Sequence, residues 1–232
     1  MLDQAVQRPD RIALWKAQMP QKPFKLYEMA DSGNCYKVRL ILNQLGIAYD
    51  RIPTDILKGE SRTPEYLAMN PNGRTPLLIL PDGTALAESN AILFYLAELS
   101  ASAPANDDTA KLFPGDLPGR ALCMQWLFFE QYSHEPFIAT NRFYLHILKD
   151  PDQFEVQIAQ NKSKGYAALD VMEKQLVQEP FFGRANYTIA DIALYAYTHV
   201  AHQGGYDLAA YPNIGSWMDR IRTQPRHIGI GD

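Results

Sequence analysis

Residues 70–99 combine two features that could hold a small, charged, peptide-like ligand. The Thr75-Pro76 bond stands immediately before an apolar run that is typical of a buried strand. An X-Pro bond there can be cis, and the backbone of Thr75 would then be exposed as an edge for a bound peptide. Glu88 and Ser89 open the next helix, where unpaired backbone N–H groups favour a ligand carboxylate. The segment therefore predicts a backbone clamp and a carboxylate clamp in one short stretch.

Composition excludes several classes of function. The chain has 232 residues, 47% apolar and 21% charged, as in a soluble protein of one large domain or two modest ones. Its net charge is −4 with Lys and Arg scattered, so we expect neither a nucleic-acid nor a membrane partner. No apolar run approaches the roughly 20 residues of a membrane-spanning helix. The two cysteines, Cys35 and Cys123, exclude a disulfide scaffold and a cysteine-based zinc site, and they favour the reducing cytoplasm.

The elements that must position these residues begin with a small α/β layer. Alternation predicts strands at 24–27 and 48–52, and helical spacing predicts a helix over 36–45. Pro64 starts a short helix, and two strands then precede the helix that opens at Glu88. This order of strand, helix, strand, helix, strand, strand and helix predicts a mixed sheet covered by helices over residues 23–100.

The second half of the chain has helical periodicity almost throughout. Residues 101–116 are rich in Ala, Ser, Pro and Asp and are interpreted as a linker. We predict an all-α bundle over 117–232, in which Pro136 interrupts one long pattern and a Thr188–Asp191 capping box starts a later helix. The first 22 residues are interpreted as a disordered or loosely held extension, with an apolar arm that packs on the fold as the alternative.

Three motifs together resemble the soluble glutathione transferase family, and the likeness runs from Phe24 to about His227. They are NPNGRTP at 70–76, ESNAILFYL at 88–96 and NYTIADIALY at 186–195. The family implies a thioredoxin-like N-terminal domain that binds glutathione as co-substrate. It also implies a helical C-terminal domain that forms most of the second-substrate pocket, and a homodimer. The loop ADSGNCYKV is most similar to the bacterial nu class, with theta-like members second.

The nu-class likeness implies roles for two residues of that loop. In the class, a small hydroxyl residue and an Asn two positions later face the glutathione sulfur, and Ser32 and Asn34 occupy those positions. A hydrogen-bond donor at a helix start would favour the thiolate over the thiol. Either residue could instead only cap the helix, since Ser and Asn are preferred N-caps. Cys35 has the spacing of the second cysteine of a CxxC pair, so we expect a buried thiol without an attacking partner.

The resemblance also implies contacts for the rest of glutathione. The backbone of Thr75, beside Pro76, would pair with the cysteinyl backbone. Ser89 would bind the α-carboxylate and Glu88 would face the ammonium, although either could be only a helix cap. Candidates for the glycine carboxylate are two cations that could equally be solvated loop charges, namely Arg74 and Lys58.

The second-substrate pocket is expected to draw on the helical half. Its candidates are Tyr132, Glu135 and Arg142, together with neighbours in 130–135 and Tyr144. The aromatic stripe in this region is interpreted as core, as helical stripes usually are, and comprises Trp126, Phe128, Phe129 and Phe137. The His-Glu pair at 134–135 has no partner at metal-ligand spacing, so we expect no metal site.

Three functions follow, in two classes. We predict an enzyme that stabilises the glutathione thiolate and transfers the sulfur to an electrophilic or disulfide substrate. The alternative is a glutathione-dependent disulfide-bond oxidoreductase, which the nu-class likeness favours. The third is a non-catalytic interaction module, and the presence of Ser32, Thr75, Glu88 and Ser89 argues against it. The sequence leaves the identity of the second substrate open.

Overall fold

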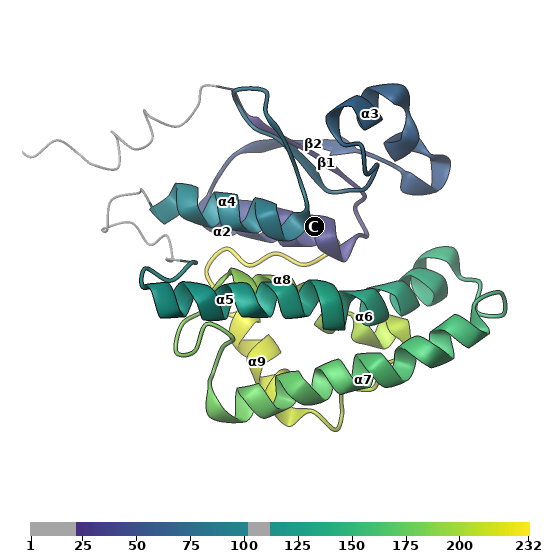
Figure 1. The fold of residues 1–232 in the computed structure, drawn as a ribbon, viewed down its shortest axis with the longest axis vertical. Coiled ribbons are helices and arrows are strands. Elements are labelled where there is room, and N and C mark those ends of the chain that lie inside the picture. Colours follow the sequence, from purple (N-terminus) through teal and green to yellow (C-terminus); the bar gives the residue numbers. More distant parts are fainter. Residues whose placement is uncertain (1–21, 102–111) are drawn as a thin grey trace, which may run out of the picture.

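The first half of the protein is a mixed sheet covered by helices. The computed structural model describes residues 22–101 and 112–232 (Figure 1). Within the first of these ranges, four strands pair in the order β2-β1-β3-β4. The elements of this half are β1 (Phe24–Glu28), α2 (Gly33–Leu45), β2 (Tyr49–Pro53), α3 (Pro64–Met69), β3 (Leu77–Ile79), β4 (Ala85–Ala87) and α4 (Ser89–Ala101). The predicted thioredoxin-like architecture is confirmed.

Connection lengths explain why the sheet is mixed. The β1–α2–β2 unit crosses over through a helix, so β1 and β2 are parallel. A short turn joins β3 to β4, so these strands are antiparallel to one another, and β3 is antiparallel to β1. Short 3-10 turns at Ile56–Lys58 and Glu60–Arg62 connect β2 to α3. In Figure 1, α2 and α4 lie between the sheet and the helical second half.

The second half is helical, as predicted. Its main helices are α5 (Leu117–Phe129), α6 (Glu135–Arg142), α7 (Glu155–Gln178), α8 (Ile189–Thr198) and α9 (Pro212–Arg222). The single pattern expected over 117–148 is interrupted near Pro136, as anticipated, because a π-helical turn at Glu130–His134 separates α5 from α6. A second π-helical turn, Phe143–Leu148, follows α6. None of the described helices is both long and apolar enough to cross a membrane.

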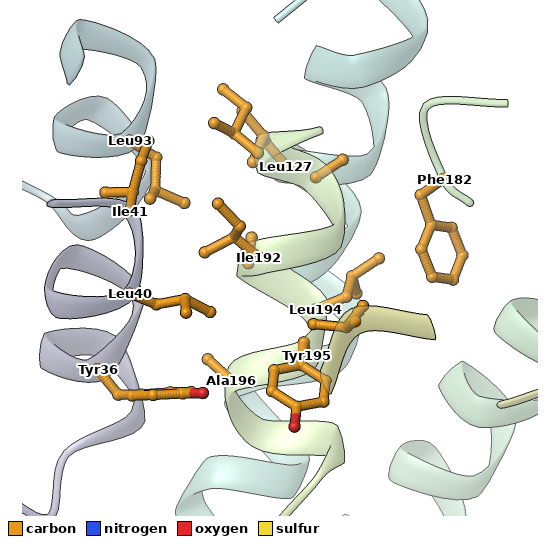
Figure 2. Packing of buried hydrophobic residues seen from close by; sticks show 14 of the residues in the cluster. Tyr36, Leu40, Ile41, Leu93, Leu127, Phe182, Ile192, Leu194, Tyr195 and Ala196 are labelled. Carbon is orange, nitrogen blue, oxygen red and sulfur yellow. The ribbon is translucent and has the colours of Figure 1, made fainter. Parts of the chain in front are cut away.

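Helix α8 lies at the centre of the helical half, and each of its residues is buried. The predicted capping box is present between Thr188 and Asp191. The buried Asp191 carboxylate also accepts bonds from the Phe182 N–H at 2.8 Å and from Trp217 Nε1 at 3.0 Å. These bonds fix the start of α8, and the helix then packs against α2. In Figure 2, Tyr36 and Leu40 of α2 point toward α8.

Residues 226–232, the C-terminal segment, run back to α2 after α9 ends (Figure 1). The Tyr36 hydroxyl donates to the Ile228 carbonyl at 2.7 Å. The fully buried Arg39 guanidinium donates to the Ile230 carbonyl at 2.8 Å and to the Ala30 carbonyl at 2.7 Å. The last residues of the chain are therefore held by the first half of the fold.

Two features differ from expectation or lie outside the described residues. Trp126 is buried as predicted, but the prediction that Phe128 is core is wrong, because 67% of its surface is exposed. Helical spacing identifies a common face without showing whether anything covers that face. The predicted extension and linker fall largely on residues 1–21 and 102–111, outside the description. Leu112 and Phe113, at the end of the predicted linker, are buried in the core.

Candidate functional site

A cavity of about 490 Å³ opens between the two halves, within the size range of small-molecule sites. Segments 29–34, 56–62 and 73–75 line it from the first half, and residues from 135–147 with Tyr197 line it from the helical half. A smaller cavity of about 60 Å³ adjoins it and includes Pro76, Glu88 and Ser89. The residues common to both cavities are Asn34, Arg74, Thr75 and Glu135.

The N-terminus of α2 points into the larger cavity. Ser32 is the N-cap of α2, and its Oγ accepts a bond from the Cys35 N–H at 3.3 Å. A hydroxyl that accepts a cap bond still has its own proton to donate. The Asn34 N–H donates to the hydroxyl of Tyr197 on α8 at 3.2 Å. The helix start is therefore capped from both halves of the chain, and Ser32 lies at the cavity wall with Asn34.

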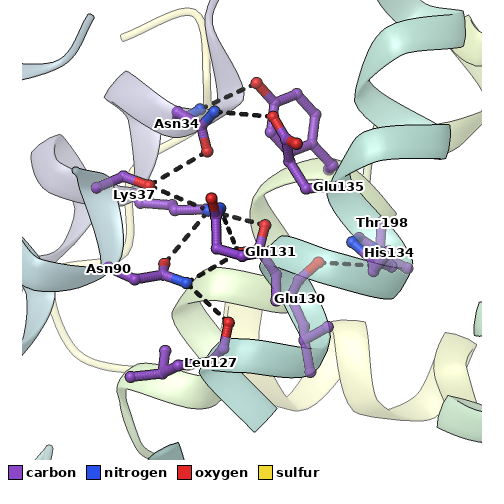
Figure 3. Close-up of polar contacts among 12 residues, drawn as sticks. Asn34, Lys37, Asn90, Leu127, Glu130, Gln131, His134, Glu135 and Thr198 are labelled. Atoms are coloured by element: carbon purple, nitrogen blue, oxygen red, sulfur yellow. Dashed lines mark hydrogen bonds and ion pairs between the residues drawn. The ribbon is translucent and has the colours of Figure 1, made fainter. Parts of the chain in front are cut away.

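The side chain of Asn34 joins two groups across the site. Its Nδ2 donates to Glu135 Oε1 at 3.1 Å, and its Oδ1 accepts from the Ser89 hydroxyl at 3.3 Å (Figure 3). Glu135 lies in the first turn of α6, and burial raises the pKa of its carboxyl group. Asn34 thus connects the start of α4 with the start of α6.

Cys35 is fully buried, as the sequence indicates, and burial raises the pKa of its thiol. Cys123 is also buried, and burial raises its pKa to about 11. Both thiols are free, and neither lines either cavity. Sulfur chemistry in these cavities therefore requires a thiol that comes from a bound molecule.

The Thr75-Pro76 peptide bond is cis. The preceding carbonyl, that of Arg74, accepts bonds from the Tyr66 hydroxyl and from Asn70 Nδ2, each at 2.8 Å. Among the described residues, none forms a hydrogen bond with the backbone of Thr75, which lines both cavities. This turn therefore presents one unpaired backbone unit to the cavities, the arrangement that a peptide ligand could pair with.

The start of α4 supplies the polar wall of the smaller cavity. Glu88 has a φ of 67°, an uncommon conformation for a side-chain-bearing residue that is often found at functional sites. Asn72 Nδ2 donates to its carboxylate at 3.4 Å. The buried Ser89 Oγ accepts from Lys37 Nζ at 3.3 Å, and Lys37 is in turn paired with Glu130 at 2.8 Å. In Figure 3, Lys37 and Glu130 face each other below Asn34.

Several predicted residues lie elsewhere or are engaged in other contacts. Lys58 is 76% exposed and pairs with Asp55 at 3.1 Å, away from both cavities. Tyr132 is 84% exposed and lines neither cavity. Arg142 does line the larger cavity, but its buried guanidinium donates to the Asp31 carbonyl at 2.6 Å and also contacts the Asp31 carboxylate. Arg142 thus holds the loop that precedes α2.

Tyr197 and Arg62 are among the residues of the larger cavity that sequence reasoning missed. Tyr197 lies beside Ser32 and Asn34 although it belongs to α8, and no local motif connects it with that loop. Arg62 packs on Gly73, where an added Cβ would lie 2.6 Å from its Nη1. The glycine at position 73 is the sequence signal that could have indicated this close approach, and its φ of 60° is one that glycine adopts readily. Among the described residues there is no group of three His, Cys, Asp or Glu side chains arranged to hold a metal ion.

The two halves match two domains of one family. The glutathione S-transferase N-terminal domain matches residues 26–104, and the glutathione S-transferase C-terminal domain matches residues 127–225. The chain therefore belongs to the glutathione S-transferase family.

Individual relatives give finer comparisons. A glutathione S-transferase structure from Pseudomonas fluorescens Pf-5 has a TM-score of 0.84 and 46% identity, covering 91% of this chain and 100% of that one. The disulfide-bond oxidoreductase YfcG of Escherichia coli K12 is 31% identical over 202 residues, 84% of this chain and 89% of that protein. A glutathione transferase family member from Pseudomonas fluorescens Pf-5, with two glutathione bound, shares the fold at a TM-score of 0.74 and 24% identity, covering 93% and 95% of the two chains.

Proposed function

We propose that this protein binds glutathione in the connected cavities and delivers its sulfur to a disulfide substrate. One observation carries the proposal: a capped helix start, an unpaired backbone unit and a polar helix start converge on one connected space. The sulfur would lie beside Ser32 and Asn34, the cysteinyl backbone would pair with Thr75, and the γ-glutamyl end would meet Glu88 and Ser89. The chemistry that follows is thiolate activation by hydrogen bonding.

The glycine carboxylate would lie toward the arginines of the larger cavity. Arg74 lines both cavities, and Arg62 lines the larger one beside it. A carboxylate between two guanidinium groups is held by charge-assisted bonds. We therefore replace Lys58 by Arg62 as the partner of Arg74 in this role.

Two observations support a disulfide as the acceptor of the sulfur. The relative YfcG is named a disulfide-bond oxidoreductase. The buried state of Cys35 and Cys123 means that glutathione itself must supply the attacking thiol. A first glutathione would form a mixed disulfide, and a second would release the product thiol and oxidised glutathione. Conjugation to other electrophiles is the second candidate, supported by the glutathione S-transferase family at large.

The first experiment is a calorimetric titration with glutathione and with oxidised glutathione, followed by turnover of a small aliphatic disulfide and of an activated aryl halide. We expect uptake of both ligands and faster turnover of the disulfide. If neither ligand binds at millimolar concentration, the proposed function fails and the non-catalytic module takes its place. If only the aryl halide reacts, conjugation is the activity.

Ser32→Ala tests the position of the sulfur. Loss of a donor to a charged sulfur should lower turnover by about 10- to 100-fold and raise the apparent thiol pKa of bound glutathione by about one unit or more. The control is Asp116→Ala, which removes the exposed N-cap of α5 away from both cavities. Each variant should lose about 1 kcal/mol of stability, but only Ser32→Ala should change the pH profile. An unchanged profile in Ser32→Ala would place the sulfur elsewhere.

We also propose a homodimer, which the family likeness implies, in the cytoplasm, the reducing compartment that the two free cysteines favour. Large apolar side chains stay exposed along α5 and the π-helical turn after it, namely Leu117, Phe128 and Tyr132. A second copy that covered this face would bury them, and Tyr132 would then belong to the interface. Light scattering of the purified protein tests this, and a monomeric mass at working concentration would reject it.

A further inference from the structure

Glu135 is a largely buried carboxylate that faces both cavities. Within the described residues, Asn34 is its hydrogen-bond partner and no cation forms an ion pair with it. A buried acidic group without a paired cation is costly, so its presence at a ligand cavity calls for an explanation. In Figure 3 its side chain points from α6 toward Asn34 on α2, which is the residue proposed to face the sulfur.

The charges around Glu135 leave it poised for proton exchange. Lys37 is the cation of α2 whose charge acts on Glu135, but it is paired with Glu130 at 2.8 Å. Arg74 approaches from the turn before β3, and the hydroxyl of Tyr197 approaches from α8. Burial, together with the negative charge of Glu130, outweighs both cations and the Asn34 hydrogen bond, so the pKa of Glu135 is raised from its ordinary value. Carboxyl groups in such settings serve as acids and bases near neutral pH.

We propose that Glu135 accepts the thiol proton of bound glutathione and returns it to the departing thiolate of a disulfide substrate. This inference rests on the function proposed above and adds a proton acceptor to it. Ser32 and Asn34 offer hydrogen bonds to a sulfur anion, but neither can take up a proton at neutral pH. The Asn34 amide has two N–H groups, so one can hold Glu135 while the other reaches the sulfur.

The step balances in atoms and electrons. The S–H bond of glutathione breaks, its proton moves to a Glu135 oxygen, and the electron pair stays on sulfur. The thiolate attacks one sulfur of the substrate disulfide, so one S–S bond forms and another breaks. The leaving thiolate takes the proton from Glu135. A second glutathione then attacks the mixed disulfide in the same way and yields oxidised glutathione.

The proposal places the donors and the acceptor on different halves of the fold. Ser32 and Asn34 come from the loop and helix of the first half, and Glu135 comes from the helical half. Thiol activation therefore depends on how the start of α6 is placed relative to the start of α2. The hydrogen bond from Asn34 Nδ2 to Glu135 Oε1, at 3.1 Å, joins the two. Any hydrogen-bond acceptor at position 135 could hold Asn34, but only a carboxylate could take up the thiol proton.

The test is the pH profile of kcat/KM for Glu135→Gln, with ultraviolet absorbance of the bound thiolate as a second readout. Glutamine keeps the shape and an acceptor for Asn34 but cannot take up a proton. We expect at least a ~100-fold loss at neutral pH and displacement of the acidic limb of the profile to the free thiol range near ~8.5. Thiolate absorbance should be displaced to the same higher pH.

Two variants bracket this result. Glu155→Gln removes the exposed first-turn glutamate of α7, as Glu135→Gln does for α6, and should leave the profile unchanged. Glu135→Asp should retain the acidic limb at a lower rate, which also covers the case in which Glu135→Gln fails to fold.

Two results would overturn the inference while leaving the proposed function intact. One is a Glu135→Gln profile with the shape of the unmodified protein. The other is a raised KM for glutathione at unchanged kcat and pH profile, which would make Glu135 a partner of the γ-glutamyl ammonium. Failure of the unmodified protein to bind glutathione in calorimetry would instead overturn the proposed function, and this inference with it.

Discussion

At the scale of single residues, the two halves of the chain can approach closely because the first residue of α2 is a glycine. Gly33 starts α2, and the ring of Tyr197 packs directly on it. A Cβ at this position would lie 2.6 Å from Tyr197 Cε1, far closer than van der Waals contact permits. The same tyrosine hydroxyl accepts the Asn34 N–H, so the ring and its oxygen together place the start of α2.

Gly33→Ala should therefore destabilise the protein by about 1–3 kcal/mol through overpacking, and it should lower glutathione turnover because the helix start is displaced. Tyr197→Leu in the same chain should recover part of the stability, since the shorter side chain leaves room for the methyl group. Denaturant unfolding of the two single variants and the double variant measures the coupling.

The control for this cycle is a helical glycine with open space around it. Gly215 lies in α9, and nothing would meet a Cβ there within 4 Å. Gly215→Ala should be neutral or stabilise by up to about 1 kcal/mol. Equal losses for Gly33→Ala with and without Tyr197→Leu would show that the ring is not the obstacle.

At the scale of elements, the π-helical turn between α5 and α6 sorts its residues into buried and exposed groups. Glu130 and His134 point into the protein, and Tyr132 points out. His134 Nε2 lies 2.9 Å from the Thr198 hydroxyl, which itself donates to the Leu194 carbonyl at 2.7 Å. His134 must therefore donate through Nε2, and its buried Nδ1 has no partner in the described part of the chain.

Burial of this imidazole predicts acid-sensitive stability. Desolvation lowers the pKa of His134 to about 4, below the ordinary 6.5, so the folded state resists a proton that the unfolded state accepts. The contribution of neutral His134 to the free energy of unfolding is fully present above pH 6.5 and is lost as pH falls from 6.5 toward 4. The expected loss at pH 5 is about 2 kcal/mol. His199, whose pKa is also lowered to about 4, adds to the loss in the same window.

His134→Gln should remove part of this acid sensitivity, because glutamine can still donate to Thr198 but does not titrate. The measurement is the free energy of unfolding in urea at pH 7.5 and pH 5. His202→Gln, a change at an exposed position in the 3-10 turn after α8, is the control. The attribution to His134 is rejected if His134→Gln loses as much stability on acidification as the unmodified protein.

Elements with regular periodicity or clear caps were predictable, and irregular ones were not. Alternation and helical spacing gave β1, α2 and α7, and the Thr188 box gave the start of α8, because these signals are local. The two π-helical turns leave no such signal, because a single wide turn is too short to show a periodicity of its own. The orientations of Tyr132 and Phe128 were lost for the same reason, because they depend on that turn and on what covers α5.

The candidate site divides in the same way. Thr75, Glu88 and Ser89 stand close in sequence, so a motif could indicate them together. Asn34 and Tyr197 are separated by 163 positions, and their contact follows from the docking of α8 on α2. Sequence places Arg142 in the second pocket, but its attachment to Asp31 depends on how the end of α6 meets the loop before α2. Sequence therefore indicated the cavity-lining groups better than the residues that position them.

At the scale of the whole molecule, the C-terminal segment 226–232 connects the end of the chain to the loop beside the site. Arg39 bonds both the Ile230 carbonyl and the Ala30 carbonyl, and Ala30 is two residues before Ser32. Asn43 on the same helix donates to the Arg226 carbonyl at 2.6 Å. Several side chains of α2 therefore hold this segment by hydrogen bonds.

Deletion of 226–232 should destabilise the protein by about 2–5 kcal/mol, because the buried Arg39 and Tyr36 would lose acceptors. Turnover should fall as well, because Arg39, which also bonds the Ala30 carbonyl of the loop before Ser32, would no longer be held by the segment. Replacement of the segment by Gly and Ser at equal length restores backbone carbonyls but not apolar packing, and should give an intermediate loss in urea unfolding. A deletion as stable as the full chain would show that the segment is dispensable.

The returning segment has a practical consequence for anyone who recombines these proteins. A chimera made by joining the front of one relative to the back of another at 102–111 would transplant a terminal peptide whose docking surface stays behind on the discarded α2. The natural unit of exchange is therefore the helical half together with the α2 side chains Tyr36, Arg39 and Asn43 that grip its end.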